Sequence, residues 1–282
     1  MRHSRRDILK QGAAGLAALG LSRSLLAEAA GKKIPIGLQL YSVRNECGKD
    51  LPGVLKAVAG FGYKGVEFAG YYGWEDKPKE LRKLLDDNGL KCCGTHTGWG
   101  TIIGDKLKET IEFNQTIGNK YLIVPGGLPG KTFNSLDGCK ETAKILSEQA
   151  AKAKEAGMRV GYHAHGGDFK KIDNDTVWDL LFANGSKDLV MQMDVGNCLD
   201  GGGDPYATIK KFPGQTVTIH MKEHGGPASA VTGEGTVKWK EVFELCETIG
   251  GTEWYIIEHE SGNDPLGSVK GCFEGMKKMG KA

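Results

Sequence analysis

Paired cysteine motifs are missing from this sequence. Its seven cysteines are scattered along the chain, and no two of them form a C-x-x-C pair. Several lie in apolar or strand-like stretches, where a cysteine behaves as a small buried hydrophobic residue. We therefore predict free thiols rather than a disulfide framework or a cysteine metal site. The cysteines are Cys47, Cys92, Cys93, Cys139, Cys198, Cys246 and Cys272.

A charge excess is also missing. The chain has 37 Lys and Arg against 35 Asp and Glu. Residues 1–29 hold five of the basic residues and two of the acidic ones, which leaves 32 basic and 33 acidic residues and a net charge of −1. A nearly neutral body lacks the electrostatic footprint of a nucleic-acid-binding protein, so no nucleic-acid partner is expected.

Nucleotide-binding motifs are absent as well. No G-x-G-x-x-G follows the first strand-like stretch, and no P-loop occurs. These absences argue against a doubly wound nucleotide-binding sheet. No linker, low-complexity tract or charge run interrupts residues 30–282. We predict that these residues form a single domain.

Residues 1–29 have the pattern of a twin-arginine export signal. The stretch Ser4–Lys10 contains Arg5 and Arg6, a modest apolar run follows over residues 12–21, and Ala27-Glu28-Ala29 matches a cleavage site. The alternative is an amphipathic N-terminal helix. The run is too short to span a bilayer. We therefore expect a periplasmic protein with no membrane segment after signal removal, and export of a folded chain would explain the unpaired thiols.

Strand-like and helix-like stretches alternate eight times over residues 30–282. This count and length predict an α/β protein, a single-domain (β/α)8 TIM barrel, whose active site lies at the C-terminal ends of the strands. The predicted strands are Ile34–Val43, Gly65–Ala69, Leu90–His96, Tyr121–Val124, Arg159–His165, Leu189–Val195, Val217–Lys222 and Trp254–Glu258. The predicted helices are Asp50–Gly60, Lys79–Asn88, Lys106–Ile117, Cys139–Ala156, Thr176–Ala183, Pro205–Lys211, Lys238–Ile249 and Pro265–Lys278.

Polar residues at the strand ends share the inward face. Side chains alternate along a strand, and the outward face of a barrel packs under helices. In the third strand, this rule puts Cys92, Gly94 and His96 on one face. The residues expected at the barrel mouth are His96, His163, His165, Asp194, His220, Lys222 and Glu258.

His, Asp, His and Glu end four successive strands, the fifth to the eighth. Burial of so many ionisable groups without compensation would cost several kcal/mol each. A divalent metal ion offsets that cost, because imidazole and carboxylate groups are its ligands. The sequence therefore predicts a metal site.

These residues carry a family likeness over about residues 33–280. The chain resembles the xylose isomerase-like TIM-barrel superfamily, the group of sugar phosphate isomerases and epimerases. The matching segments are Gly37-Leu38-Gln39-Leu40-Tyr41-Ser42-Val43-Arg44, Gly161-Tyr162-His163-Ala164-His165, Met193-Asp194-Val195-Gly196-Asn197, His220-Met221-Lys222, Gly233-Glu234-Gly235 and Ile257-Glu258.

The resemblance implies one divalent ion, Mn, Co or Zn, held by residues that end strands five to eight. Carried over, these ligands are His163, Asp194, His220 and Glu258, with His165 as an alternative to His163. Epimerases of the superfamily use a strand-five Glu and a strand-eight Glu as opposed acid and base, whereas strand five here offers His163. Related DNA-repair endonucleases have a second His where this chain has Asn197, which argues against a nuclease.

The resemblance also implies roles for the surrounding residues. Glu258, Lys222 and His165 are the expected catalytic residues, with Glu258 as general base. For Glu67 a structural ion pair is an equal alternative to substrate binding, and Trp99 either stacks on a sugar or packs in the core. The expected substrate-binding residues are Tyr41, Glu67, His96, Trp99 and Asn197.

The predicted function is a metal-dependent isomerase or epimerase that acts on a sugar or keto-sugar through an enediolate. One alternative is a lyase or hydrolase of 3-keto-glycosides that works by β-elimination. Another is an exported sugar-binding protein without catalysis. The expected partner is a small-molecule sugar or glycoside, and the sequence leaves open whether the chain forms a homo-oligomer.

Overall fold

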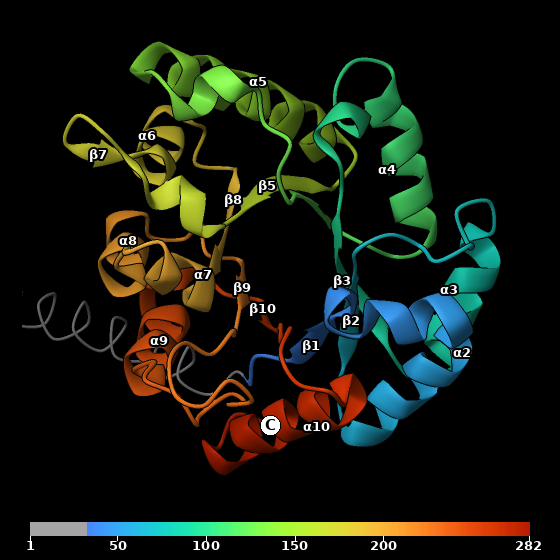
Figure 1. Cartoon of the computed structure of the whole chain (residues 1–282). Helices are drawn as coiled ribbons and strands as arrows, with labels where there is room; N and C mark the ends of the chain where they lie inside the picture. Colours follow the sequence, from blue (N-terminus) through green and yellow to red (C-terminus); the bar gives the residue numbers. More distant parts are fainter. Residues whose placement is uncertain (1–32) are drawn as a thin grey trace, which may run out of the picture. The chain divides into compact units, whose positions relative to one another are not determined.

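The computed structural model describes residues 33–282, and the export signal predicted for residues 1–29 lies outside them. Eight parallel strands close into a barrel in the order β1-β10-β9-β8-β5-β4-β3-β2. Helices surround these strands (Figure 1), so the predicted (β/α)8 TIM barrel is confirmed. The barrel strands are β1 (Ile36–Gln39), β2 (Gly65–Phe68), β3 (Lys91–His96), β4 (Tyr121–Val124), β5 (Arg159–His163), β8 (Val190–Asp194), β9 (Thr218–His220) and β10 (Trp254–Ile257).

The eight predicted helices are all present, with some boundaries shifted. They are α2 (Arg44–Phe61), α3 (Pro78–Asp87), α4 (Lys106–Thr116), α5 (Leu136–Glu155), α6 (Val177–Asn184), α8 (Pro205–Lys211), α9 (Trp239–Leu245) and α10 (Pro265–Lys278). A π-helical turn, Cys246–Gly250, continues α9. The sequence did not predict the short helix α7 (Val195–Asp200) or the hairpin formed by β6 (Lys171–Ile172) and β7 (Asp175–Thr176).

The largest boundary error lies in α2, which starts six residues before the predicted Asp50. Asp50 itself leaves the helical conformation (φ −154°, ψ 77°), and its side chain accepts a hydrogen bond from the Gly53 N–H at 3.0 Å. This is an N-cap contact. Two helical segments therefore meet at Asp50, and the hydrophobic periodicity predicted only the second of them.

Strands end earlier than predicted at the mouth of the barrel. The predicted strand Ile34–Val43 stops at Gln39, whose side chain accepts from the Tyr41 N–H and starts a 3-10 turn over Leu40–Val43. The predicted strand Arg159–His165 stops at His163. The chain turns away from the barrel at both points, so the polar residues lie at the ends of the strands and beyond.

A β-bulge in β3 corrects the predicted face pattern. The pairing of β2 with β3 shifts between Val66 and Glu67, which face Cys92 and Gly94 respectively. Cys93 is the extra residue, so Cys92 does not share a face with His96 as predicted. Cys92 instead lines a surface pocket with Arg82 and Leu85 of α3. A one-residue insertion reverses the alternation of side chains, and nothing in the sequence marks its position.

Two apolar regions enclose the strands. The larger core lies between the barrel and its helices and includes Leu38, Phe68, Trp178 and Met193. A smaller cluster contains Tyr121, Ile123, Val190 and Val217, with Trp254 packed against it. Val190, Gln192 and Asp194 occupy every second position of β8 and therefore share one face. That face changes from apolar to polar toward the carboxyl end of the strand.

All seven cysteines are free and buried, as predicted. No helix within residues 33–282 is both long and apolar enough to cross a bilayer.

Candidate metal centre

Four predicted ligands converge at the carboxyl ends of neighbouring strands. His163 ends β5, Asp194 ends β8, His220 ends β9, and Glu258 follows β10 directly. One ligand atom from each lies within 4.8 Å of every other. The four residues are between 0% and 5% exposed. The set contains His163 and not His165, so His163 stays the predicted ligand of the two.

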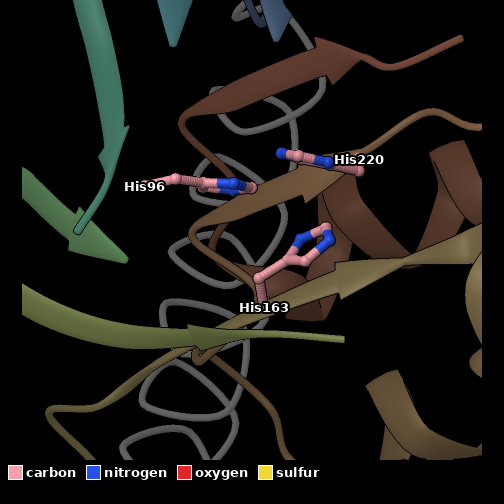
Figure 2. Close-up of side chains that lie close together, drawn as sticks. All are labelled: His96, His163 and His220. Carbon is pink, nitrogen blue, oxygen red and sulfur yellow. The ribbon is translucent and has the colours of Figure 1, made fainter. Parts of the chain in front are cut away.

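Three histidine side chains meet at this mouth from different strands. Figure 2 shows His96 of β3, His163 of β5 and His220 of β9 with their rings close together. The ring centroids of His163 and His220 are 4.5 Å apart, and those of His96 and His163 are 4.8 Å apart. The predicted convergence of these strand ends is therefore observed.

Asp194 is held in place by the helix that it begins. It is the N-cap of α7, and its Oδ1 accepts from the Asn197 N–H at 2.7 Å. Gly196 allows this turn to approach β9, since a Cβ there would lie 2.9 Å from Lys222 Cγ and 2.8 Å from a backbone oxygen. Asn197 Nδ2 donates to the Ala164 carbonyl at 3.0 Å. The Asp-Val-Gly-Asn segment thus ties the ends of three strands together.

Two buried polar atoms of the cluster lack hydrogen-bond partners among the described residues, namely Asp194 Oδ2 and His220 Nδ1. His220 Nδ1 lies 2.8 Å from Glu258 Oε2 and 3.7 Å from Asp194 Oδ2. Buried atoms of this kind are rare because each costs about 1–3 kcal/mol. Two imidazoles and two carboxylates around them form a ligand set for a divalent ion, so the residues present fit such a group.

The cluster brings ionisable side chains together in the buried end of the barrel, and each changes the pKa of its neighbours. Burial alone would raise the pKa of Glu258, but His220, His163 and Lys222 outweigh it and hold that pKa well below its usual range. Burial alone would lower the pKa of His220, but Glu67, Asp194 and Glu258 together raise it. Positive charge is therefore favoured at the centre of these carboxylates.

Glu67 lies beneath the cluster, fully buried, rather than facing the mouth. Its Oε2 is 2.6 Å from His220 Nε2 and accepts from Gln39 Nε2 at 2.7 Å, and its Oε1 accepts from Gln192 Nε2 at 2.8 Å. Protein donors thus occupy both oxygens. This corresponds to the ion-pair alternative for Glu67 and not to contact with a substrate.

A cavity of about 450 Å³ opens above the cluster. It is lined by Tyr41, Ala69, Gly70, His96, Pro125, His163, His165, Asn197, Glu258 and Glu260. Six of these residues were predicted from the sequence. Glu260 was missed, although it follows Glu258 by two positions, and a longer application of the alternation rule would have found it.

Tyr41 is 41% exposed at the cavity wall, and the Arg44 guanidinium lies 4.1 Å from its ring centroid. The side chain of His165 is exposed, yet the surrounding protein shields it enough to lower its pKa. Trp99 is absent from the part of the lining that the structure describes. It packs against the hydrophobic core, which corresponds to the core alternative.

Lys222 connects the cluster to Glu260. Its Nζ lies 3.3 Å from Glu258 Oε1 and also bonds Glu260 Oε1. Burial alone would lower the pKa of Lys222, but Asp194, Glu258 and Glu260 raise it. The ammonium group therefore stays charged next to the cavity, where it can stabilise negative charge that develops on a bound molecule.

A closed parallel barrel with polar residues around a cavity at its carboxyl end defines a TIM-barrel enzyme that acts on small molecules. The chain belongs to the xylose isomerase-like TIM barrel family, whose profile matches residues 55–279.

Similar proteins include a dehydratase and a sugar phosphate isomerase/epimerase. An inosose dehydratase of Lacticaseibacillus casei is 25% identical, and the match covers 71% of this chain and 78% of that protein. A sugar phosphate isomerase/epimerase structure from Parabacteroides distasonis is 26% identical, with a TM-score of 0.75 over 87% of this chain and 98% of that one. The fold also matches the zinc-bound IOLI protein at 11% identity, with a TM-score of 0.66 over 88% and 96% of the two chains.

Proposed function

We propose that this protein is a divalent-metal-dependent isomerase or epimerase that removes a proton next to the carbonyl group of a sugar or keto-sugar. The observation that carries the proposal is the convergence of His163, Asp194, His220 and Glu258 below an open cavity. These residues would hold the ion, which we expect to be Mn, Co or Zn. When bound, such an ion acts as a Lewis acid that polarises a carbonyl oxygen.

Glu258 is the proposed general base. Its Oε2 faces His220 and its Oε1 faces Lys222, and the residue lines the cavity. Its low pKa keeps it ionised, so it can accept a proton from a carbon acid. Loss of that proton yields an enediolate, whose negative charge the Lys222 ammonium stabilises.

His165 is the proposed second acid–base group. It lines the cavity just after β5, which β8 and β9 separate from β10 in the barrel. Its lowered pKa keeps the imidazole neutral at neutral pH, so it can accept or donate a proton. An acid–base pair on separated strands suits epimerisation, and a single base suits isomerisation. Tyr41, His96 and Asn197 line the cavity and are the proposed contacts for substrate hydroxyl groups.

The test is Glu258→Gln, with a panel of ketoses and keto-glycosides in deuterated water. We expect the wild-type protein to incorporate solvent deuterium at the carbon next to the carbonyl, and the variant to lose this exchange by at least about 100-fold. Substrate binding, measured by calorimetry, should persist. Glu253→Gln at the opposite end of the barrel is the control. Exchange at the wild-type rate in Glu258→Gln would show that Glu258 is not the base.

A second candidate is β-elimination from a keto-sugar or a 3-keto-glycoside. Two observations favour it: His163 stands where the epimerases of the resemblance have a carboxylate, and the matched relative from Lacticaseibacillus casei is a dehydratase. The same panel separates the candidates, because elimination gives an unsaturated ketone and a released group, whereas isomerisation gives neither. Binding of a sugar without exchange or product would instead identify a sugar-binding protein.

A further inference from the structure

The layer beneath the candidate ligands is built around one enclosed carboxylate. We call Gln39, Glu67, Gln192 and Thr218 the polar layer. All four are completely buried. They come from β1, β2, β8 and β9, so the layer extends across the inside of the barrel. Its hydrogen bonds reach His96, His163 and His220, the three rings of Figure 2.

Each bond in this layer has a fixed direction, because an ionised carboxylate only accepts hydrogen bonds. Each oxygen of Glu67 lies within 2.8 Å of a side-chain nitrogen, which is the arrangement of an ionised carboxylate surrounded by donors. Gln39, Gln192 and His220 must then donate to it through their Nε2 atoms. Gln192 Nε2 also donates to Thr218 Oγ1 at 3.0 Å. The amide of Gln192 can therefore be oriented in only one way.

The orientation of Gln192 determines the histidine tautomers. Its Oε1 accepts from His163 Nδ1 at 3.0 Å and from His96 Nε2 at 3.1 Å. His163 thus carries its proton on Nδ1, which leaves Nε2 as the ligand atom. His220 Nε2 donates to Glu67, so Nδ1, which faces Asp194 and Glu258, is the nitrogen that would exchange its proton for an ion. The two imidazoles would bind an ion through different nitrogens.

An irregularity in β3 makes room for the side chain of Glu67. The bulge in β3 places Gly94 beside Glu67, and a Cβ at Gly94 would lie only 2.3 Å from Glu67 Oε1. Any side chain at position 94 would displace the carboxylate. The bulge and the glycine are therefore part of the arrangement that holds Glu67.

We propose that Glu67 is a positioning residue of the metal centre, which selects the histidine tautomers and so the nitrogen through which His163 and His220 bind. This inference rests on the metal centre of the proposed function. Carboxylates that hydrogen-bond a ligand histidine commonly change metal affinity 10–100-fold when they are replaced.

The first test is Glu67→Gln, which keeps the size of the side chain. It replaces one accepting oxygen by an NH₂ group, which is a donor and cannot accept from the donors around it. We expect affinity for Zn²⁺, measured by competition with a chelator, to fall about 10–100-fold. Glu253→Gln should bind Zn²⁺ as the wild-type protein does. A folded Glu67→Gln variant with wild-type affinity and unchanged histidine tautomers would overturn the proposal.

The second test needs no variant and decides the matter if Glu67→Gln fails to fold. Imidazole nitrogen NMR of the Zn²⁺-loaded wild-type protein should show ligation through Nε2 of His163 and Nδ1 of His220. Ligation through the other nitrogen of either residue would overturn the proposal. If the wild-type protein binds no Zn²⁺, the metal centre itself is wrong. In that case the spectrum of the metal-free protein tests the role of Glu67. We expect His163 to carry its proton on Nδ1, and a proton on Nε2 would overturn that role.

Discussion

Buried charge is balanced locally around the candidate metal centre. Glu67, Asp194 and Glu258 surround His220, and Lys222 bonds Glu258 at its outer side. Removal of one partner from such a group costs about 3–5 kcal/mol, because it leaves an uncompensated charge. Single substitutions here therefore affect stability as well as activity, and each test above includes a check of folding or a matched control.

Asp168 is the clearest buried carboxyl outside this cluster. Its Oδ1 accepts from Tyr162 Oη at 2.8 Å, and its Oδ2 accepts from the His165 N–H at 2.7 Å. Burial raises its pKa from 3.8 to about 6 in spite of these hydrogen bonds. The folded state therefore holds this proton to higher pH than the unfolded state does. Its contribution to stability is complete below the unfolded pKa and is lost as pH rises through about 6.

Asp168→Asn should remove this dependence, because an amide does not titrate and can still accept from His165 and donate to Tyr162. We expect the unfolding free energy of the wild-type protein, relative to the variant, to fall by about 3 kcal/mol or less as pH rises from about 4 to about 7. Urea unfolding at several pH values measures this difference. A difference that does not change with pH would contradict the assignment.

Among the structural elements, the loop after β9 depends on one side chain. Glu223 accepts hydrogen bonds from the N–H groups of Gly233 (2.6 Å) and Val237 (3.2 Å) and from Trp239 Nε1 (2.8 Å). The Gly233-Glu234-Gly235 motif folds around this carboxylate, and a Cβ at Gly235 would lie 2.6 Å from Glu223 Oε1. The motif thus helps to hold the conformation of the loop that follows Lys222.

Glu223→Ala should open this loop, because it removes the acceptor for these three donors and for the neighbouring His224 N–H. We expect a loss of about 1–3 kcal/mol in unfolding free energy and faster hydrogen exchange at the amides of Gly233 and Val237. Glu234→Ala is the matched control, since Glu234 makes one local bond, to the Val231 N–H at 3.2 Å. Equal exchange at these amides in both variants would show that Glu223 does not order the loop.

Hydrophobic periodicity was sufficient to predict the barrel and the order of its elements, because closed parallel strands must bury an apolar outward face. It also located His163, Asp194, His220 and Glu258, because strand ends converge. It failed at Cys92, where a bulge reverses the alternation, and at α7, whose six residues are too few for a helical period. The roles of Glu67 and Gln192 depend on contacts between distant strands, which no local pattern reveals.

At the scale of the whole molecule, export of the folded chain stays a prediction. Its motif lies in residues 1–29, outside the described residues, whereas the seven free and buried thiols belong to the barrel. Replacement of Arg5 and Arg6 by Lys should leave an uncleaved precursor in the cytoplasm, because twin-arginine export depends on both side chains. Cell fractionation and mass measurement of the N-terminus check this. Unchanged processing and location would contradict the assignment.

The central claim is that the barrel mouth holds one divalent ion between His163, Asp194, His220 and Glu258. An anomalous difference map from a crystal grown with Zn²⁺ tests it most directly. We predict a single strong peak about 2.0–2.2 Å from His163 Nε2, Asp194 Oδ2, His220 Nδ1 and a carboxylate oxygen of Glu258. A map with no peak among these four side chains, in a crystal whose surface sites are occupied by Zn²⁺, would contradict the account.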